Sequence, residues 1–229
     1  MAAQGPRRQM ASSWAAQFER ERARYADGEA RVEELADADE RQRQLTRMGN
    51  AATGAGLALL MDDRKAEAGD WLSRAAVRYR ESFAYAPPGS WGRPIGAVKA
   101  RVLADDWSSA ADDARWTLAA GAAESDSPIG RYAACLELLV LEKDEAGHEL
   151  AGSIVDRDDF PDGVGRALAA IAAADRPGYA AAVVDVLRSF ETRDGYLEDI
   201  AVADTVIVLQ ALARRGGLDV ELCSPLLPA

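Results

Sequence analysis

One short motif recurs along the chain at the spacing of a helical hairpin. The triplet Pro-Ile-Gly at 94–96 returns 34 residues later at 128–130, and a weaker copy, Pro-Asp-Gly, follows 33 residues further on at 161–163. Proline is tolerated in the first turn of a helix, where its missing N–H would have no intrahelical partner. Each copy therefore predicts the start of a helix, and the constant spacing predicts a repeated helix–turn–helix unit.

The residues between these motifs strongly favour helices. Long stretches rich in Ala, Leu, Glu and Arg carry apolar residues at i, i+3, i+4 and i+7, and no run alternates as a strand does. A second landmark, at 69–71, 105–107, 143–145 and 177–179, is expected to open the following helix of each unit. The sequence predicts an all-α fold with helices over 13–46 (broken near Gly28), 47–61, 65–84, 94–104, 107–120, 128–142, 144–155, 161–174, 177–192 and 199–214.

The segment 106–114, Asp-Trp-Ser-Ser-Ala-Ala-Asp-Asp-Ala, resembles the start of the second helix of a tetratricopeptide (TPR) repeat. The resemblance covers about 65–193, although 94–104 lacks the glycine and aromatics usual in that family's first helix. It implies a right-handed α-solenoid of about four to five hairpins, whose first helices line a peptide-binding groove. An ordinary helical bundle with coincidental proline spacing is the alternative.

The two ends of the chain differ from the repeats. Residues 1–46 form a charged N-terminal segment, and 47–229 the expected helical-repeat domain. Phe18, Tyr25 and Val32 recur at heptad spacing, which is typical of a helix capping the end of the stack or of a coiled coil that joins two copies through 13–46. The tail 218–229 is expected to pack as an irregular strap through Val220, Leu222 and Leu226.

Charge and composition restrict the classes of partner that the protein is expected to bind. The chain has 27 basic and 38 acidic side chains, a net charge of −11, which disfavours nucleic acid and anionic membranes as partners. Neither a secretory signal nor an apolar run long enough for a bilayer occurs, so we expect a cytoplasmic protein. Cys135 and Cys223 are isolated and are expected to be buried, reduced thiols.

Motifs of catalysis are scarce. The single histidine, His148, is expected on the surface of a helix, and neither a nucleophile elbow nor a phosphate-binding loop occurs. We therefore expect no enzyme, no cofactor and no metal site. A carboxylate- or metal-dependent hydrolase remains the alternative, because acids are paired at 62–63, 105–106, 112–113 and 158–159, where solvated surface positions are the simpler explanation.

One segment runs against the overall charge. Residues 89–104 contain no acid but hold Trp91, Arg93, Lys99 and Arg101, and the repeat register adds Arg131 and Arg166 to a basic strip on the first helices. The hypothesis is a non-catalytic protein-binding module whose groove selects an acidic segment or a terminal carboxylate.

Two alternatives to this hypothesis stay open. The cations of the strip can pair with acids of adjacent helices, and Trp91 can plug a turn against the core. The protein can also be an immunity or antitoxin-type inhibitor that neutralises a basic toxin through its acidic surface.

Overall fold

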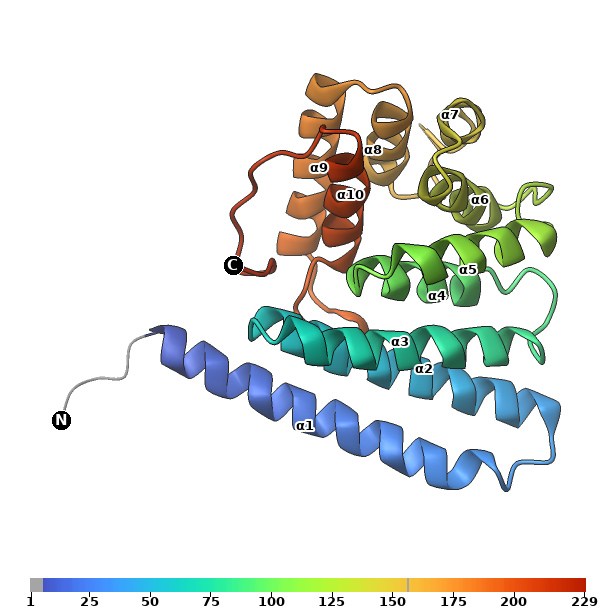
Figure 1. Ribbon diagram of the computed structural model, residues 1–229, viewed down its shortest axis with the longest axis vertical. Coiled ribbons are helices and arrows are strands. Elements are labelled where there is room, and N and C mark those ends of the chain that lie inside the picture. Colours follow the sequence, from blue (N-terminus) through green and yellow to red (C-terminus); the bar gives the residue numbers. More distant parts are fainter. Residues whose placement is uncertain (1–5, 156) are drawn as a thin grey trace.

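A computed structural model describes residues 6–155 and 157–229, and this part of the chain is helical, with no β-strand (Figure 1). The all-α prediction is confirmed. The helices are α1 (Pro6–Val32), α2 (Ala38–Met61), α3 (Lys65–Phe83), α4 (Gly92–Leu103), α5 (Trp107–Ala119), α6 (Pro128–Val140), α7 (Asp144–Gly152), α8 (Asp162–Ala172), α9 (Arg176–Glu191) and α10 (Asp204–Arg215), with a 3-10 turn at Leu197–Asp199 before α10. No described helix is both long enough and apolar enough to cross a lipid bilayer.

The first predicted boundary was wrong. The chain leaves helical geometry at 33–37, whereas the sequence suggested breaks near Gly28 and after residue 46. Gly28 lies inside α1, where a side chain would collide with Met48 of α2, and residue 46 lies inside α2. Asp37 starts α2, because its carboxylate accepts the backbone N–H of Glu40 at 2.8 Å.

Four helix pairs are joined by the same three-residue turn. At the end of α2 the N–H of Asp63 donates to the carbonyl of Leu60, and that of Arg64 to the carbonyl of Leu59, at 3.2 and 2.9 Å. This pair of bonds is a Schellman motif, which requires a positive φ at its central residue. The same bonds and the same left-handed residue recur in all four turns, at Asp63, Asp105, Glu142 and Ala174. We call α2, α4, α6 and α8 the first helices, and α3, α5, α7 and α9 the second helices.

The prolines and the second landmark occupy related but unequal places. Pro128 is the first residue of α6, Pro94 the third residue of α4, and Pro161 the N-cap of α8. Trp107 opens α5 as expected, but Trp71 lies well inside α3. Helix α3 begins at Lys65, in agreement with the predicted range 65–84, so the landmark at 69–71 lies inside the helix and does not open it.

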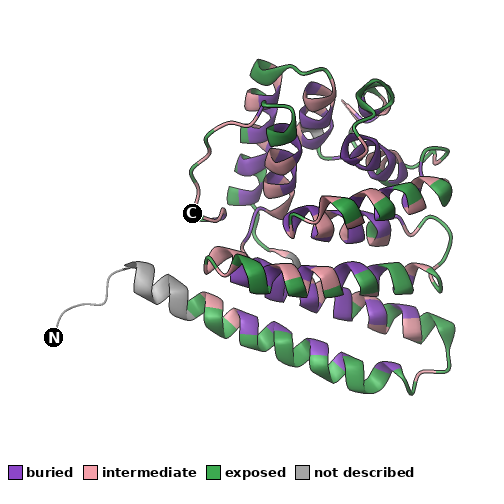
Figure 2. Cartoon of the chain, in the orientation of Figure 1, coloured by how far each residue is buried: buried purple, intermediate pink, exposed green. Residues whose placement is uncertain are grey.

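Each hairpin packs on the next. Helix α3 packs on α4, α5 on α6 and α7 on α8, while the first helices also touch one another, α2 with α4, α4 with α6 and α6 with α8. Figure 2 shows the buried residues on the helix faces that meet between these elements. The closest approach surrounds Tyr79 of α3. A Cβ at Gly49 or at Gly96 would lie 2.7 or 2.8 Å from its ring, so α2 and α4 both need glycine there.

The two ends of the chain cover the hairpins in different ways. The heptad stripe of α1 packs inside the molecule, with Phe18 and Tyr25 edge-on to Trp71 at 5.8 and 5.4 Å. At the other end α10 turns back and packs against α4, α8 and α9. Figure 1 shows α10 next to α9. The tail then runs without helix or strand along α10, with Leu226 buried, which confirms the predicted irregular strap.

Candidate functional site

The six residues of the predicted basic strip fall on three first helices but have different surroundings. Trp91 is buried before α4, and its ring centroid lies 5.9 Å from that of Phe83. The guanidinium of Arg93 donates to the hydroxyl of Ser82 at 2.8 Å and to the amide oxygen of Gln42. Burial lowers the pKa of Arg93. Arg93 therefore ties α4 to α2 and α3.

Arg101 faces the neighbouring second helix. Its guanidinium lies 3.4 Å from the carboxylates of Asp106 and Asp113. Arg80 of α3 also binds Asp113, at 2.6 Å. The expectation that the paired acids are solvated was wrong for Asp113, which is buried because two arginines from adjacent helices neutralise it.

Arg131 and Arg166 point to groups near their own helices. The Nε of Arg131 donates to the carbonyl of Ser125 at 3.3 Å, and its Nη2 lies 3.6 Å from Asp126. Arg166 pairs with Asp185 of α9 at 3.1 Å.

Pairing with an acid of an adjacent helix, which the sequence left as an alternative, is present at Arg101 and Arg166. Arg131 instead pairs with Asp126 of the preceding loop, and Arg93 binds uncharged groups. The structure does not gather the strip around one cleft.

Lys99 is the one residue of the strip that meets the C-terminal helix. Its ammonium lies 2.5 Å from the carboxylate of Asp204 and 3.0 Å from the hydroxyl of Thr205. Burial alone would lower the pKa of Lys99, but the carboxylate of Asp204 raises it above its usual value. An acid therefore does bind this lysine of a first helix, and it belongs to the same chain.

Polar contacts hold α10 at its middle and end as well. The hydroxyl of Tyr179 in α9 donates to the side-chain oxygen of Gln210 at 2.7 Å. Arg215 donates to the carbonyl of Val140 at 3.0 Å, pairs with Glu142, and lies over the ring of Trp107 at 4.4 Å. These contacts tie α10 to α9, to the end of α6 with the turn after it, and to the start of α5.

The segment 192–203, which leads into α10, is anchored at Glu198. Its carboxylate lies 2.5 Å from the guanidinium of Arg24 in α1 and accepts the amide of Asn50 in α2 at 3.1 Å. Arg20 donates to its backbone carbonyl at 3.1 Å. Glu198 and Asp199 both have positive φ, 56° and 57°, in consecutive positions where L-residues are uncommon.

A cleft of about 700 Å³ opens where α10 and the tail approach the ends of α2 and α4. Its walls are mostly apolar, and charged groups such as Lys65, Asp105 and Arg214 stand at the rim. The apolar wall consists of Leu60, Val102, Leu103, Ile207, Ala211, Val220, Leu222 and Leu227.

The remaining candidate residues occupy ordinary structural positions. His148 is exposed on α7, as predicted. Cys135 is buried, and burial raises the pKa of its thiol to about 12. Cys223 is exposed in the tail, so the prediction that both thiols are buried was wrong there. Among the residues that the structure describes, no three His, Cys, Asp or Glu side chains form a group that could hold a metal ion.

No protein-family model, curated protein or solved structure that we compared matches this chain. Function must therefore be argued from the contacts themselves. Sequence reasoning missed the most informative of these, between Lys99 and Asp204, because the two residues lie 105 positions apart. The only available signal was the acid at the start of an otherwise apolar helix, Asp204 before Val206–Leu209.

Proposed function

We propose that this protein is a non-catalytic protein-binding module, built as a TPR-like stack of helical hairpins. The four identical turns and the contacts between successive first helices support this reading. In such a stack the layer of first helices forms an inner surface suited to an elongated segment of a partner, by apolar contacts and Arg or Lys pairing.

The observation that supports the proposal most directly is the packing of α10. A helical segment lies on first helices α4 and α8 and on second helix α9, and its first carboxylate, Asp204, pairs with Lys99. Apolar side chains of α10 are buried in the same contact, Val206 fully and Leu209 almost so. This is the mode of recognition in which an amphipathic helix lays its apolar face on a helical surface.

The test begins with recovery of the partner from the native cell and its purification. Hydrogen exchange of the full chain is then measured with and without a saturating amount of the partner. We expect altered exchange in α4, α6, α8 and α10. Variants of exposed acids on second helices, Asp112→Lys in α5 and Asp144→Lys in α7, should bind the partner with unchanged affinity.

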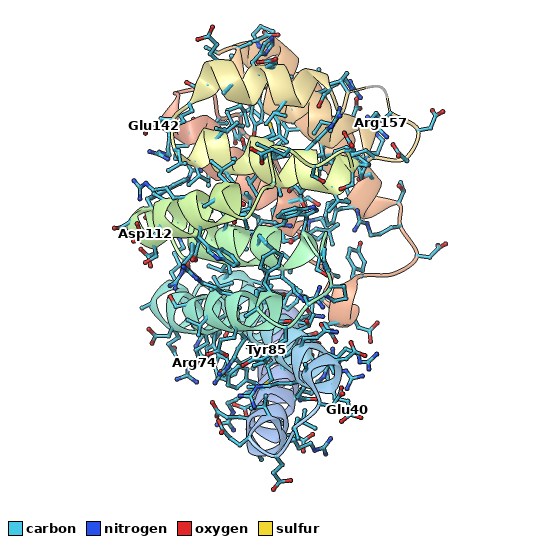
Figure 3. All side chains as sticks on the ribbon, turned by 90° about the vertical axis from the view of Figure 1, so that its right-hand side faces the viewer. Glu40, Arg74, Tyr85, Asp112, Glu142 and Arg157 are labelled. Carbon is cyan, nitrogen blue, oxygen red and sulfur yellow. The ribbon has the colours of Figure 1, made fainter. Side chains whose placement is uncertain are left out.

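The immunity or antitoxin alternative predicts a different outcome. An exchange footprint confined to α5 and α7 would overturn the inner-surface proposal. So would an affinity that falls steeply with salt and is lost in Asp112→Lys or Asp144→Lys, because surface charge would then drive recognition. Figure 3 shows Asp112 at the outer edge of the molecule, where such an acidic partner surface would lie.

A further inference from the structure

The C-terminal helix differs from the first helices of the hairpins in the segments that precede and follow it. It finishes with the Schellman turn of the hairpins, at Gly217, but an extended tail takes the place of a second helix. It is joined to α9 by the twelve-residue segment 192–203, longer than the eight or nine residues that join one hairpin to the next. The chain therefore delivers α10 to α4 and α8 as a tethered segment.

Several features make α10 an imperfect occupant of this surface. Its N-cap, Ala203, makes no side-chain hydrogen bond to the free N–H groups of the first turn, a feature that α10 shares with α3, α4, α7 and α8. The segment that leads to it holds two consecutive left-handed residues, Glu198 and Asp199. On one side, the cleft of about 700 Å³ separates α10 and the tail from the ends of α2 and α4. A free helix with an N-capping side chain and no tether would lack the first two of these features.

The surface around Lys99 that holds α10 favours a particular kind of helix. Lys99 is mostly buried, its side chain only 15% exposed, so an unpaired ammonium there would be costly. It favours a helix that brings a carboxylate in its first turn, followed by branched apolar residues two and five positions later, as Asp204, Val206 and Leu209 do.

We propose that α10 is an exchangeable occupant of a helix-binding site on α4, α8 and α9, and that the site fits an amphipathic partner helix with an acid in its first turn. This inference rests on the proposed function and names the partner of the same surface. Tethering gives α10 a high effective concentration, so a partner must compete with it. The acid and the apolar face are the features that a competing helix must reproduce.

The test uses a fluorescent peptide of residues 200–217 as the probe and the full chain as receptor. In the wild type the chain's own α10 blocks the site, and peptide binding is weak. Asp204→Lys places a cation against Lys99 and loosens α10, so we expect peptide affinity to rise by about tenfold or more. A peptide that carries the same Asp204→Lys change should not bind.

Two further variants keep the result interpretable. Asp112→Lys makes the same charge change in an exposed pair with Arg115, 2.8 Å apart, and should bind the peptide as the wild type does. The swap Lys99→Asp with Asp204→Lys restores opposite charges and should close the site again. Peptide affinity that is equal in the wild type and in Asp204→Lys would overturn the inference and make α10 a fixed core helix.

This failure is separate from failure of the proposed function. The peptide reports whether α10 exchanges, whereas the hydrogen-exchange footprint of the purified partner reports where that partner binds. A partner that protects α4, α6 and α8 from hydrogen exchange without releasing α10 would support the proposed binding module. It would overturn the proposal that a partner helix displaces α10.

Discussion

Two buried tyrosines show how differently the two halves of the molecule are held together. Tyr79 of α3 and Tyr179 of α9 both lie in second helices, and both donate a hydroxyl hydrogen bond to a side-chain amide, Asn50 at 2.9 Å and Gln210 at 2.7 Å. Burial raises the pKa of both phenols, that of Tyr79 to about 12. The chemistry at the hydroxyl is thus the same.

The surroundings of the two rings differ. The ring of Tyr79 fills space left by Gly49 of α2 and Gly96 of α4, so three helices joined in sequence approach closely around it. Tyr179 instead donates to α10, which the chain reaches through the segment 192–203 and which both polar contacts and buried apolar side chains such as Val206 and Leu209 hold in place. Close packing of this kind is lost only with large-scale unfolding, whereas polar contacts can be exchanged for water or for a partner at small net cost.

The largest expected effect tests the close-packed half. Tyr79→Ala leaves a cavity between α2, α3 and α4, and we expect it to lower the free energy of unfolding by about 4 kcal/mol, measured by urea denaturation. Tyr85→Ala is the matched control, because that ring is 46% exposed and its loss should cost less than about 0.5 kcal/mol. Equal effects of the two substitutions would mean that the three helices do not meet around Tyr79.

Helix α6 lies between the two halves and contains a buried carboxyl group. Glu137 is fully buried, and neither of its oxygens has a hydrogen-bond partner among the residues that the structure describes. Burial, and then the nearby charge of Asp113, raise its pKa well above the usual value. Because the folded pKa lies above the unfolded one, the folded state holds this proton more tightly, and stability falls as pH rises above the unfolded value.

Glu137→Leu should therefore stabilise the protein, by about 1–3 kcal/mol at pH 8 and by less near pH 4. Thermal unfolding of the wild type and the variant across this range measures the difference. Glu137→Gln is the companion variant, since it removes the titration but keeps a buried polar group. A difference between wild type and Glu137→Leu that does not change with pH would contradict the assigned protonation.

The comparison of the tyrosines is sharpened by removing only their hydroxyls. Each change to Phe deletes one hydrogen bond, worth about 1 kcal/mol. We expect Tyr79→Phe to lower global stability. We expect Tyr179→Phe mainly to speed hydrogen exchange within α10, because of the two hydroxyl bonds only that of Tyr179 joins α10 to the hairpins. Faster exchange throughout the molecule in both variants would show that α10 belongs to the same cooperative unit.

The sequence predicted what local periodicity encodes. The helices, the buried stripe of Phe18 and Tyr25, the buried Cys135 and the exposed His148 all follow from the pattern of apolar residues along a helix. The start of α2 was missed although Asp37 and Glu40 form a recognisable N-terminal signal, because helix-favouring residues continue on both sides of the break.

The candidate site was less predictable, since a single sequence does not show which distant residues meet. The basic strip assumed that equivalent positions share one open face, but Arg101 turns toward Asp113 and Arg166 toward Asp185. The pair of Lys99 with Asp204 depends on the path of 192–203, which no local pattern specifies. Likewise, the shared turns were hidden because their left-handed residues are Asp, Glu and Ala instead of glycine.

The smallest expected effect concerns the Schellman turns, which occur within the hairpins and also at the end of α10. Ala174 has a φ of 53°, is exposed and carries no side chain beyond its Cβ, so glycine should relieve about 1–2 kcal/mol of backbone strain. Glycine also has more conformational freedom than alanine in the unfolded chain, and this lowers the free energy of unfolding by about 0.4–1 kcal/mol. We expect Ala174→Gly to raise the free energy of unfolding by about 0.5–1 kcal/mol in urea denaturation.

The matched turns separate backbone strain from side-chain effects. Asp105→Gly should gain less, because the Asp105 carboxylate accepts the indole N–H of Trp107 at 2.7 Å and that bond would be lost. Gly217 already occupies the same position after α10, so Gly217→Ala should cost about what Ala174→Gly gains. If Gly217→Ala changed only the hydrogen exchange of α10 while Ala174→Gly stabilised the whole chain, the same turn would have a global effect within the hairpins and a local effect on the tethered helix.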